Sequence, residues 1–245
     1  MTDRLTIGVI DPEVLGTYGD TGNALVLSHR ARARGIATDI VEIHLDEAIP
    51  ADLDLYVMGG GEDTAQALAA DHLRRCADFT AALRRGRTLL AICASLQILG
   101  RSYTDATGRE VAGAEVLDIS TTPQGHRSIG ELVTAPLLPG LTQPLTGFEN
   151  HGGATQLGPD ARPLGRVLSG SGNAADHDGG AVDGACQGGV VATYMHGPVL
   201  ARNAELADYL LARAVGCEVG DLAELDMPLV DQLHAERVRA AGVSA

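Results

Sequence analysis

Two residues of the sequence combine type and position in a way that suggests nucleophilic catalysis, Cys93 and His196. Cys93 follows the apolar run Thr88–Ile92, which predicts a buried parallel strand, and it precedes Ala94–Leu99, which predicts the first turns of a helix. A thiol at such a turn projects from the carboxyl edge of a sheet, and the helix N-terminus favours a thiolate and a developing oxyanion. The alternative is a buried structural cysteine, the commoner role of a free cysteine.

A nucleophilic Cys93 needs a general base, and two of the eight histidines are candidates. His196, in the segment Met-His-Gly-Pro, and His151, in the segment Asn-His-Gly-Gly, both follow predicted strands in glycine-rich surroundings. A Cys–His pair generates a thiolate and an imidazolium, and the imidazolium can then protonate a leaving amine. Residue context favours His196 over His151 only modestly.

The first hundred residues alternate between predicted strands and helices, which is the pattern of a doubly wound α/β sheet. Strands are predicted over 5–10, 38–44, 53–58 and 88–92, and helices over 23–34, from 62 to 86 with a break near Asp71, and over 94–99. Such sheets bind ligands beyond the carboxyl ends of their strands. The glycines at 59–61 end the third strand, so they form either a flexible turn or an oxyanion donor near Cys93.

Beyond residue 102 the pattern changes to short strands and loops. Strands are predicted at 115–119, 128–134, 146–149 and 188–194, an exposed loop at 169–189, and helices at 203–215 and 229–240. Arg127 opens one of these strands and is either a solvated surface residue or a cation that faces a carboxylate substrate. We divide the chain into one domain over residues 1–216 and a C-terminal helical extension over 217–245.

Composition excludes several classes of function. The net charge of −14 argues against a nucleic-acid-binding surface. Neither a membrane-spanning stretch nor a secretion signal is indicated, so we expect a cytoplasmic protein without membrane insertion. The four cysteines form no CxxC pair, so no zinc site or disulfide framework is expected. The absence of lysine excludes a Walker A loop and a Schiff-base mechanism, so any ATP in the pathway is expected to bind another chain.

Six stretches, taken in order, resemble the class I (Cys-dependent) glutamine amidotransferases. The similarity is to the branch that includes the cobyric acid and cobyrinic acid diamide synthase glutaminases and the glutaminase subunits of lipid II isoglutaminyl synthases. The stretches are 18–23 (Tyr-Gly-Asp-Thr-Gly-Asn), 59–63, 92–100, 127–131, 147–153 and 193–198 with the helix that follows. The resemblance implies a flavodoxin-like fold, a mostly parallel sheet with flanking helices, and the C-terminal helix lies outside it.

The resemblance also implies a role for each matched residue. Cys93 would attack the side-chain amide of L-glutamine, forming a γ-glutamyl thioester and releasing ammonia, with His196 as general base and acid. The N–H groups of Gly60 and Ala94 would form the oxyanion hole, and Arg127 would hold the α-carboxylate. Ammonia would pass to a Mur-ligase-like, ATP-binding partner in a heterodimer, which amidates the D-glutamate of lipid II to D-isoglutamine. No metal or cofactor is implied for this chain.

The sequence departs from the wider class at two places. Ala91 and Ser95 replace the glycines that flank the cysteine, so the turn must be built with small side chains or the site is impaired. Pro198 stands where the wider class has the glutamate that completes a triad. A carboxylate must therefore come from elsewhere in this chain or from the partner, and by analogy with the related glutaminase subunits we favour a partner aspartate.

Two other hypotheses fit the same residues. The chain could be the glutaminase of another amidating system, such as one in cobalamin biosynthesis. It could also be a non-catalytic regulatory binder on the same scaffold, for which replacement of Cys93 would leave function unchanged.

Overall fold

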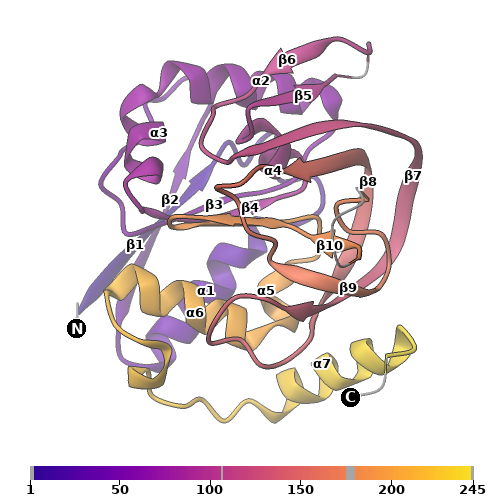
Figure 1. Cartoon of the computed structure of the whole chain (residues 1–245). Helices are drawn as coiled ribbons and strands as arrows, with labels where there is room; N and C mark the ends of the chain where they lie inside the picture. Colours follow the sequence, from indigo (N-terminus) through magenta and orange to yellow (C-terminus); the bar gives the residue numbers. More distant parts are fainter. Residues whose placement is uncertain (1–2, 106, 175–179, 244–245) are drawn as a thin grey trace.

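The computed structural model describes residues 3–105, 107–174 and 180–243, and these residues form two six-stranded sheets with flanking helices (Figure 1). The first sheet contains β1 (Arg4–Ile10), β2 (Ala37–Ile43), β3 (Leu55–Met58), β4 (Thr88–Ile92), β11 (Ala185–Gln187) and β12 (Val190–Thr193). The second contains β5 (Ser102–Thr104), β6 (Glu110–Ala112), β7 (Ile119–Pro136), β8 (Leu145–Leu157), β9 (Gly165–Ser169) and β10 (Val182–Asp183).

The first sheet has the strand order β11-β12-β4-β3-β1-β2. All neighbours are parallel except β11 and β12, which are antiparallel. Without β11, the order is that of a flavodoxin-like doubly wound sheet, in which ligands bind at the carboxyl ends of the strands. The predicted fold class is therefore confirmed.

Helices cover both faces of the first sheet. One face carries α1 (Gly22–Ala33), α5 (Val199–Arg202) and α6 (Ala204–Val215), and the other carries α2 (Asp63–Arg75), α3 (Ala77–Arg84) and α4 (Ala94–Ile98) (Figure 1). The helical stretch from 62 to 86 is interrupted at Cys76 and not near Asp71 as predicted.

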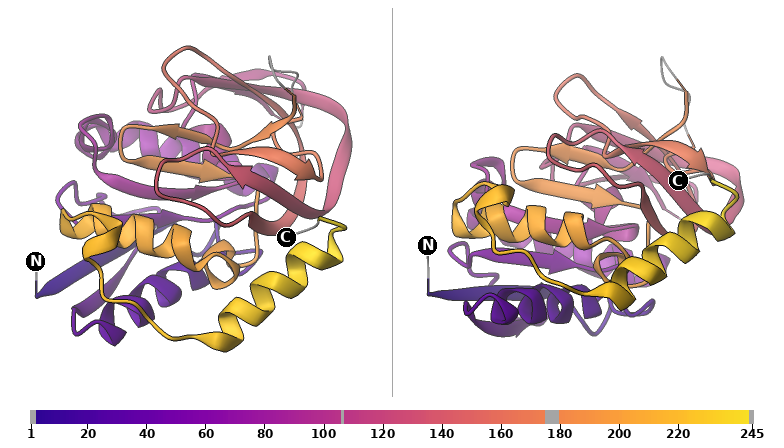
Figure 2. Two further views of the ribbon diagram at one scale, coloured as in Figure 1. Left: turned by 60° about the horizontal axis from the view of Figure 1, so that its bottom comes forward. Right: turned by 90° about the horizontal axis from the view of Figure 1, so that it is seen from below.

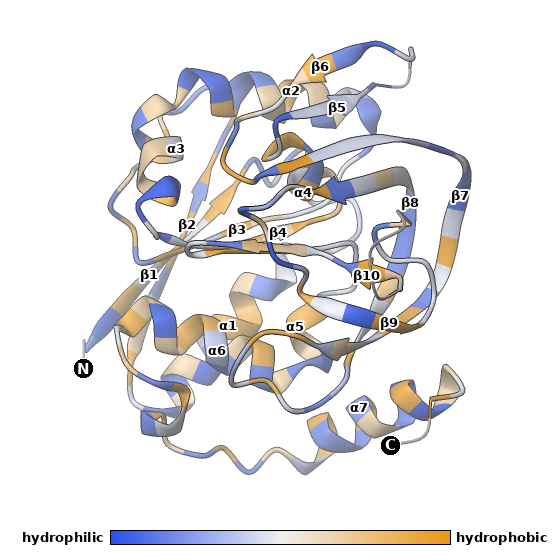
Figure 3. Ribbon diagram, viewed as in Figure 1, coloured by the Kyte–Doolittle hydropathy of each residue, from blue (hydrophilic) through white to orange (hydrophobic). Residues whose placement is uncertain are grey.

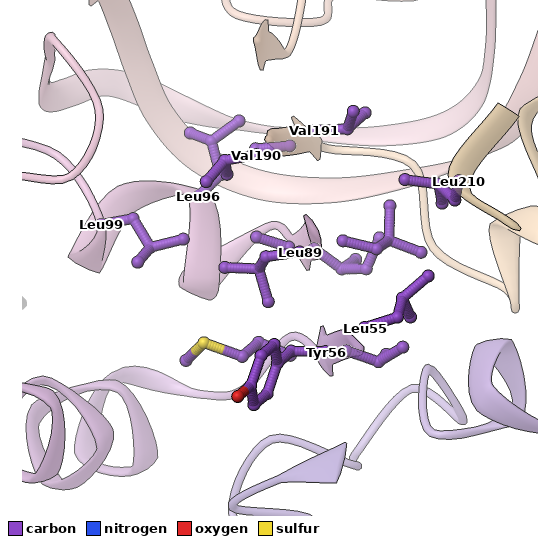
Figure 4. Packing of buried hydrophobic residues seen from close by; sticks show 14 of the residues in the cluster. Leu55, Tyr56, Leu89, Leu96, Leu99, Val190, Val191 and Leu210 are labelled. Carbon is purple, nitrogen blue, oxygen red and sulfur yellow. The ribbon is translucent and has the colours of Figure 1, made fainter. Parts of the chain in front are cut away.

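The hydrophobic core lies around the central strands of the first sheet, because helices cover both of its faces. Every residue of β3, β4 and β12 is buried, because a parallel strand with helices on both faces has no solvent-facing side. These strands are correspondingly almost entirely apolar, with Thr88 and Thr193 as polar end residues (Figure 3). Leu96 of α4 and Leu99, which follows it, pack around these central strands from one side, and Leu210 of α6 packs from the other (Figure 4). The edge strand β2 instead mixes buried and exposed positions.

The region from residue 102 to residue 189 is where local patterns predicted least. The strand expected at 115–119 is absent except for Ile119, which begins β7. The stretch 169–189, expected to be an exposed loop, contains the short strands β10 and β11 and the fully buried Asp183 and Ala185, while residues 175–179 lie outside the described residues. These strands are too short for a hydrophobic period, and they form because tertiary pairing supplies their hydrogen bonds.

The C-terminal segment lies at the outside of the molecule. After a 3₁₀ turn (Val219–Asp221), the helix α7 (Pro228–Ala240) runs along the periphery, as the two views in Figure 2 show. It buries Val238 but leaves Leu229 79% exposed. Among the described residues, no helix combines the length and the apolar character that crossing a bilayer requires.

Candidate active site

Four strand ends of the first sheet meet at one place. The strands β12, β4, β3 and β1 are successive neighbours. The segments that leave their carboxyl ends carry, in the same order, His196, Cys93, Gly60 and Asp20. Side chains far apart in the sequence are therefore brought together where doubly wound folds bind their ligands.

Cys93 occupies the expected strand-to-helix turn between β4 and α4. Its backbone has φ 50° and ψ −100°, a region that side-chain-bearing residues seldom adopt, so the turn holds it under strain. The Cys93 N–H donates to Thr193 O at 2.8 Å, and the Ser95 hydroxyl donates to Gly59 O at 2.5 Å. Ala91 is fully buried. The small residues that replace the flanking glycines are thus accommodated, and Ser95 ties the turn to the glycine run.

The imidazole of His196 is buried and oriented by a carboxylate of the same chain. Its Nδ1 lies 2.8 Å from Asp20 Oδ2, and since a carboxylate only accepts, Nδ1 carries the proton and donates it. Burial alone would lower the pKa of His196, but the hydrogen bonds and charges of Asp20 and Cys93 outweigh it and raise the pKa to about 10. The buried Nε2 has no hydrogen-bond partner among the described residues. It is the nitrogen left for the Cys93 thiol, and apo sites commonly hold such pairs slightly apart.

Asp20 is the functional residue that the sequence reasoning missed. It is fully buried, and its carboxylate accepts from His196 Nδ1, from the Gly60 N–H at 3.0 Å and from the Gly197 N–H at 3.3 Å. Of the two sources that the sequence left open, the geometry supports a carboxylate from this chain over the partner aspartate that we favoured. The available signal was an acidic residue in a glycine-rich turn directly after a parallel strand.

Contacts of the residues around Asp20 hold the turn 18–23 in place, which is one of the stretches that resemble the family. Asn23 donates to Asp20 O at 2.9 Å and accepts from the Leu200 N–H at 3.0 Å. A Cβ on Gly22 would come within 2.5 Å of Pro198 Cγ, so only glycine allows the turn to lie against the segment that carries His196. The turn at 18–23 is thus built to hold a carboxylate on the imidazole.

The structure speaks against the predicted oxyanion-hole role of Gly60. Its N–H is occupied by Asp20 Oδ2, and a Cβ at this position would lie 2.5 Å from His196 Cε1. A glycine is therefore needed at position 60 because the imidazole of His196 packs directly against it. Gly61, the next residue, borders the cavity together with Cys93 and Ala94.

The cavity beside Cys93 is narrow, about 40 Å³, and polar groups surround it. Its remaining walls come from the turn after β1, from the start of α2, from α4, and from β7 and β8: Tyr18, Glu62, Asp63, Gln66, Gln97, Arg127, Asn150, His151 and Gly152. Arg127 is exposed at the rim and donates from Nε to Asn150 Oδ1 at 2.7 Å. The structure therefore brings Cys93, Ala94 and Arg127 to one cavity, with His196 behind it.

His151, the other candidate base, is committed to other contacts. Its Nδ1 lies 3.0 Å from Gly153 O and its Nε2 lies 3.4 Å from Glu149 Oε2. Its ring stacks on Tyr194 with centroids 3.7 Å apart. It forms part of the cavity wall, whereas the neighbouring Cys93 contributes to the raised pKa of His196.

Comparison with known structures agrees with this fold. The crystal structure of a glutamine amidotransferase superposes with a TM-score of 0.53 at 20% identity, covering 85% of this chain and 98% of that chain. The glutaminase domain of a Trypanosoma brucei CTPS with bound acivicin superposes with a TM-score of 0.52 at 10% identity, covering 87% of this chain and 95% of that one. At these identities the likeness concerns the fold alone.

Sequence comparison is more specific. The subunit GatD of lipid II isoglutaminyl synthase (glutamine-hydrolyzing) from Staphylococcus aureus strain N315 is 37% identical over 217 residues, 88% of this chain and 85% of that protein. Its counterpart from Streptococcus pneumoniae R6 is 32% identical over 96% of this chain and 89% of that protein. A cobyric acid synthase of Brucella melitensis biotype 2 is 33% identical, but the match covers 76% of this chain and 37% of that enzyme.

The family profile of the CobB/CobQ-like glutamine amidotransferase domain matches residues 6–204. This range includes the turn with Asp20, the glycine run, the strained Cys93 and the His196 segment. By that match and by the arrangement of these residues, the chain belongs to the CobB/CobQ-like glutamine amidotransferase family.

Proposed function

We propose that this chain is the glutamine-hydrolysing subunit of a two-chain amidotransferase that amidates the D-glutamate of lipid II to D-isoglutamine. The observation that carries the proposal is the line of groups Cys93, His196 and Asp20 at the carboxyl edge of the parallel sheet. Such a line is the arrangement that a Cys-dependent acyl transfer requires. It uses no group from outside the chain.

The chemistry proceeds in two halves that share His196. Nε2 removes the thiol proton, Cys93 Sγ attacks the amide carbon of L-glutamine, and the imidazolium returns the proton to the leaving nitrogen, so that ammonia departs and a γ-glutamyl thioester remains. Water, deprotonated by Nε2, then attacks the thioester carbon. The S–C bond breaks, L-glutamate leaves and the thiol is restored. Asp20 stabilises the imidazolium in both halves.

The developing oxyanion requires two donors beside Cys93. We assign them to the N–H groups of Ala94 and Gly61, in place of the pair Gly60 and Ala94. Ala94 begins α4, and the first N–H of a helix has no acceptor within it. Gly61 lines the cavity, while the Gly60 N–H is bound to Asp20. Donors fixed by the backbone need no reorganisation when charge develops.

Arg127 is suited to the α-carboxylate of the substrate. It lies at the rim of the cavity, and its guanidinium, held through Nε by Asn150, keeps most of its N–H groups available for a planar anion. A substrate anchored there extends its side-chain amide toward Cys93.

The relatives that match over nearly their whole length support this acceptor and a partner, since both are named subunit GatD of lipid II isoglutaminyl synthase (glutamine-hydrolyzing). A second subunit must then activate the carboxylate with ATP, and we propose a Mur-ligase-like protein. The absence of lysine from this chain supports that division of labour.

The test is co-expression with a candidate Mur-ligase-like partner, followed by mass analysis of the peptidoglycan stem peptide. The wild-type pair should convert one carboxyl of the stem to an amide, and Cys93→Ser should abolish the change. Cys217→Ser, a matched replacement of a partly exposed cysteine outside the cavity, should retain it. Glutaminase activity with an unamidated stem would point to another acceptor, and amidation by Cys93→Ser would point to a non-catalytic role.

A further inference from the structure

Thr193, the last residue of β12, bonds to the segments that carry both members of the catalytic pair. Its carbonyl accepts from the Cys93 N–H at 2.8 Å. Its hydroxyl accepts from the Met195 N–H at 3.1 Å, and Met195 is the residue before His196. The position of Cys93 relative to His196 therefore depends on how Thr193 is held.

A fully buried carboxylate holds Thr193. Asp183 Oδ2 accepts from the Thr193 hydroxyl at 2.5 Å, and Asp183 Oδ1 accepts from the Tyr194 N–H at 3.2 Å. Both Asp183 and Thr193 are 0% exposed. One cluster therefore satisfies the Thr193 hydroxyl and the N–H groups of Tyr194 and Met195. Because these bonds lie where β12 ends, they set the direction in which the chain leaves the sheet toward His196.

Asp183 lies where the chain passes from the second sheet to the first. It ends β10, and β11 of the first sheet begins two residues later. Asn173 Oδ1 accepts from the Gly184 N–H at 2.8 Å, and Asn173 Nδ2 donates to Gly184 O at 3.0 Å. Gly184 has φ 74°, and a Cβ there would lie 2.2 Å from Ala192 O, so only glycine lets the crossing lie against β12. The second sheet thus presents Asp183 to β12 at a fixed place.

The charge of Asp183 suits the orientation of neighbouring groups better than the stabilisation of the fold. Burial raises its pKa to about 6, with Glu149 adding to the rise and the bonds from Thr193 and Tyr194 and the charge of His151 opposing it. A buried carboxylate contributes little net stability, because its hydrogen bonds must first offset the loss of hydration. Above about pH 6 it is an anion, and an anion that accepts from two donors holds both in one geometry.

We propose that Asp183 is a positioning residue that keeps His196 within reach of Cys93. It acts through Thr193 and the turn after β12, and it is not one of the residues that border the cavity. Without the carboxylate, the Thr193 hydroxyl and the Tyr194 N–H would lose their buried acceptor. The inference rests on the proposed function for the reaction that the pair performs, and it adds the link through which the second sheet orients the pair.

The test compares two replacements of Thr193 in the full chain. Thr193→Val keeps the shape of the side chain and the carbonyl that accepts from Cys93, but it removes the hydroxyl. We expect kcat for L-glutamine hydrolysis to fall about tenfold or more with KM within about twofold, because a misplaced base slows the chemical steps without weakening binding. Thr193→Ser restores the hydroxyl and should recover most of kcat.

Thr38→Val is the matched control. Thr38 is also a buried threonine of the first sheet, and its hydroxyl bonds to Ser28 Oγ at 2.6 Å and accepts from Arg32 Nε at 2.8 Å. It lies on the edge strand β2, and β4, β3 and β1 separate that strand from β12. This variant should lose stability in urea unfolding, while kcat and KM change less than about twofold.

Asp183→Asn tests the carboxylate itself. The amide can present its N–H₂ group where the Thr193 hydroxyl now donates, so kcat should fall as it does in Thr193→Val. Because the two residues act through one hydrogen bond, the double variant should be slower than the slower single variant by no more than about twofold.

Alkylation of Cys93 by iodoacetamide reports on the pair without turnover. Its rate at pH 7, followed by mass analysis of the Cys93 peptide, should fall about threefold or more in Thr193→Val, because the reactivity of a thiolate depends on a nearby imidazolium. The same rate should stay unchanged in Thr38→Val.

A fall of kcat in Thr193→Val that is no greater than in Thr38→Val would overturn the proposal, as would a kcat that Thr193→Ser does not recover. Slower alkylation in Thr193→Val of a chain that never hydrolyses glutamine would support the positioning role and contradict the proposed function. Hydrolysis and alkylation that are both insensitive to Thr193→Val would do the reverse.

Discussion

The Asp20 carboxylate accepts hydrogen bonds from three groups, and each belongs to a segment that borders the nucleophile. The first is His196 Nδ1, the second is the Gly60 N–H in the glycine run after β3, and the third is the Gly197 N–H, which follows His196. One side chain therefore selects the tautomer of the imidazole and holds the surrounding backbone in position. Its loss should affect catalysis more than binding.

Replacing Asp20 with asparagine tests this role. Because the amide can present its N–H₂ to Nδ1 and stabilise the wrong tautomer, we expect kcat for glutamine hydrolysis to fall on the order of a hundredfold or more, with KM changed little. The pKa of His196, followed by NMR, should fall from about 10 as well. Asp46→Asn, at an exposed position away from the cavity, is the matched control. Unchanged kcat in Asp20→Asn would return the orienting role to the partner.

The same pair makes stability depend on pH in a definite direction. The pKa of His196 is raised in the folded chain from 6.5 to about 10, so its stabilising contribution is complete below pH 6.5 and is lost as the pH rises toward 10. The free energy of unfolding of wild type minus that of His196→Gln should therefore shrink by a few kcal/mol between pH 6.5 and 10. Urea titrations of both proteins at each pH measure it, and a constant difference would contradict the pKa shift.

At the scale of elements, the segment from Asp11 to Thr21 carries both Tyr18 and Asp20, and a buried ion pair anchors it. Asp11, at the end of β1, lies 2.7 Å from Nδ1 of His72 on α2, and His72 Nε2 lies 2.7 Å from Glu47 O. Both side chains are almost completely buried. Burial raises the pKa of Asp11 to about 6 against the lowering effect of His72. The pair therefore fixes where this segment leaves the sheet.

His72→Leu removes the partner and leaves a buried carboxyl alone. We expect the free energy of unfolding to fall by about 3 kcal/mol, because an unpaired buried charge is costly. L-Glutamine should also bind more weakly to the surviving fold, since Tyr18 and Asp20 lose their anchor. Urea unfolding and calorimetry measure the two effects. His44→Leu, which breaks the half-exposed pair with Glu13, should cost less than about 1 kcal/mol.

At the scale of the whole molecule, the two sheets carry the site while the C-terminal segment attaches to the outside. Its contacts include Arg34 Nε to Ala223 O at 2.7 Å and His234 Nδ1 to Arg202 O at 2.8 Å, together with the buried Leu222 and Val238. None of these residues borders the cavity at Cys93. We therefore propose that residues 217–245 are an extension of a domain that ends at residue 216.

Truncation after residue 216 tests the boundary. The loss of two buried apolar side chains should lower the free energy of unfolding by roughly 3 kcal/mol, while the affinity for L-glutamine of the Cys93→Ala chain should stay within about twofold. Urea unfolding and calorimetry provide both values. A truncated chain that fails to fold would show that the extension belongs to the domain.

The sequence predicts the parallel strands of the first sheet well because the central ones are almost entirely apolar. Thr88–Ile92 is the clearest case, and the turn that places Cys93 follows from it. In the second sheet, the predicted strands 128–134 and 146–149 lie within β7 and β8. The full length of this pair was not predictable, because it joins residues remote in the chain, such as Ile119 and Leu157. Asp20 lies 176 residues from His196, and no local period connects them. The sequence could not indicate that the Gly60 N–H is bound to Asp20, because the direction of one N–H depends on where Asp20 lies.

The backbone of His196 forms an isolated antiparallel bridge with Phe148 of β8 in the second sheet. Its N–H donates to Phe148 O at 2.8 Å and its carbonyl accepts from the Phe148 N–H at 3.3 Å. A one-residue insertion or deletion between Leu145 and Phe148 reverses the direction in which each following side chain faces. It also replaces Phe148 by another residue in the hydrogen bonds to the backbone of His196. Insertions and deletions in this segment should therefore be tolerated least, although it lies far from Cys93 in the sequence.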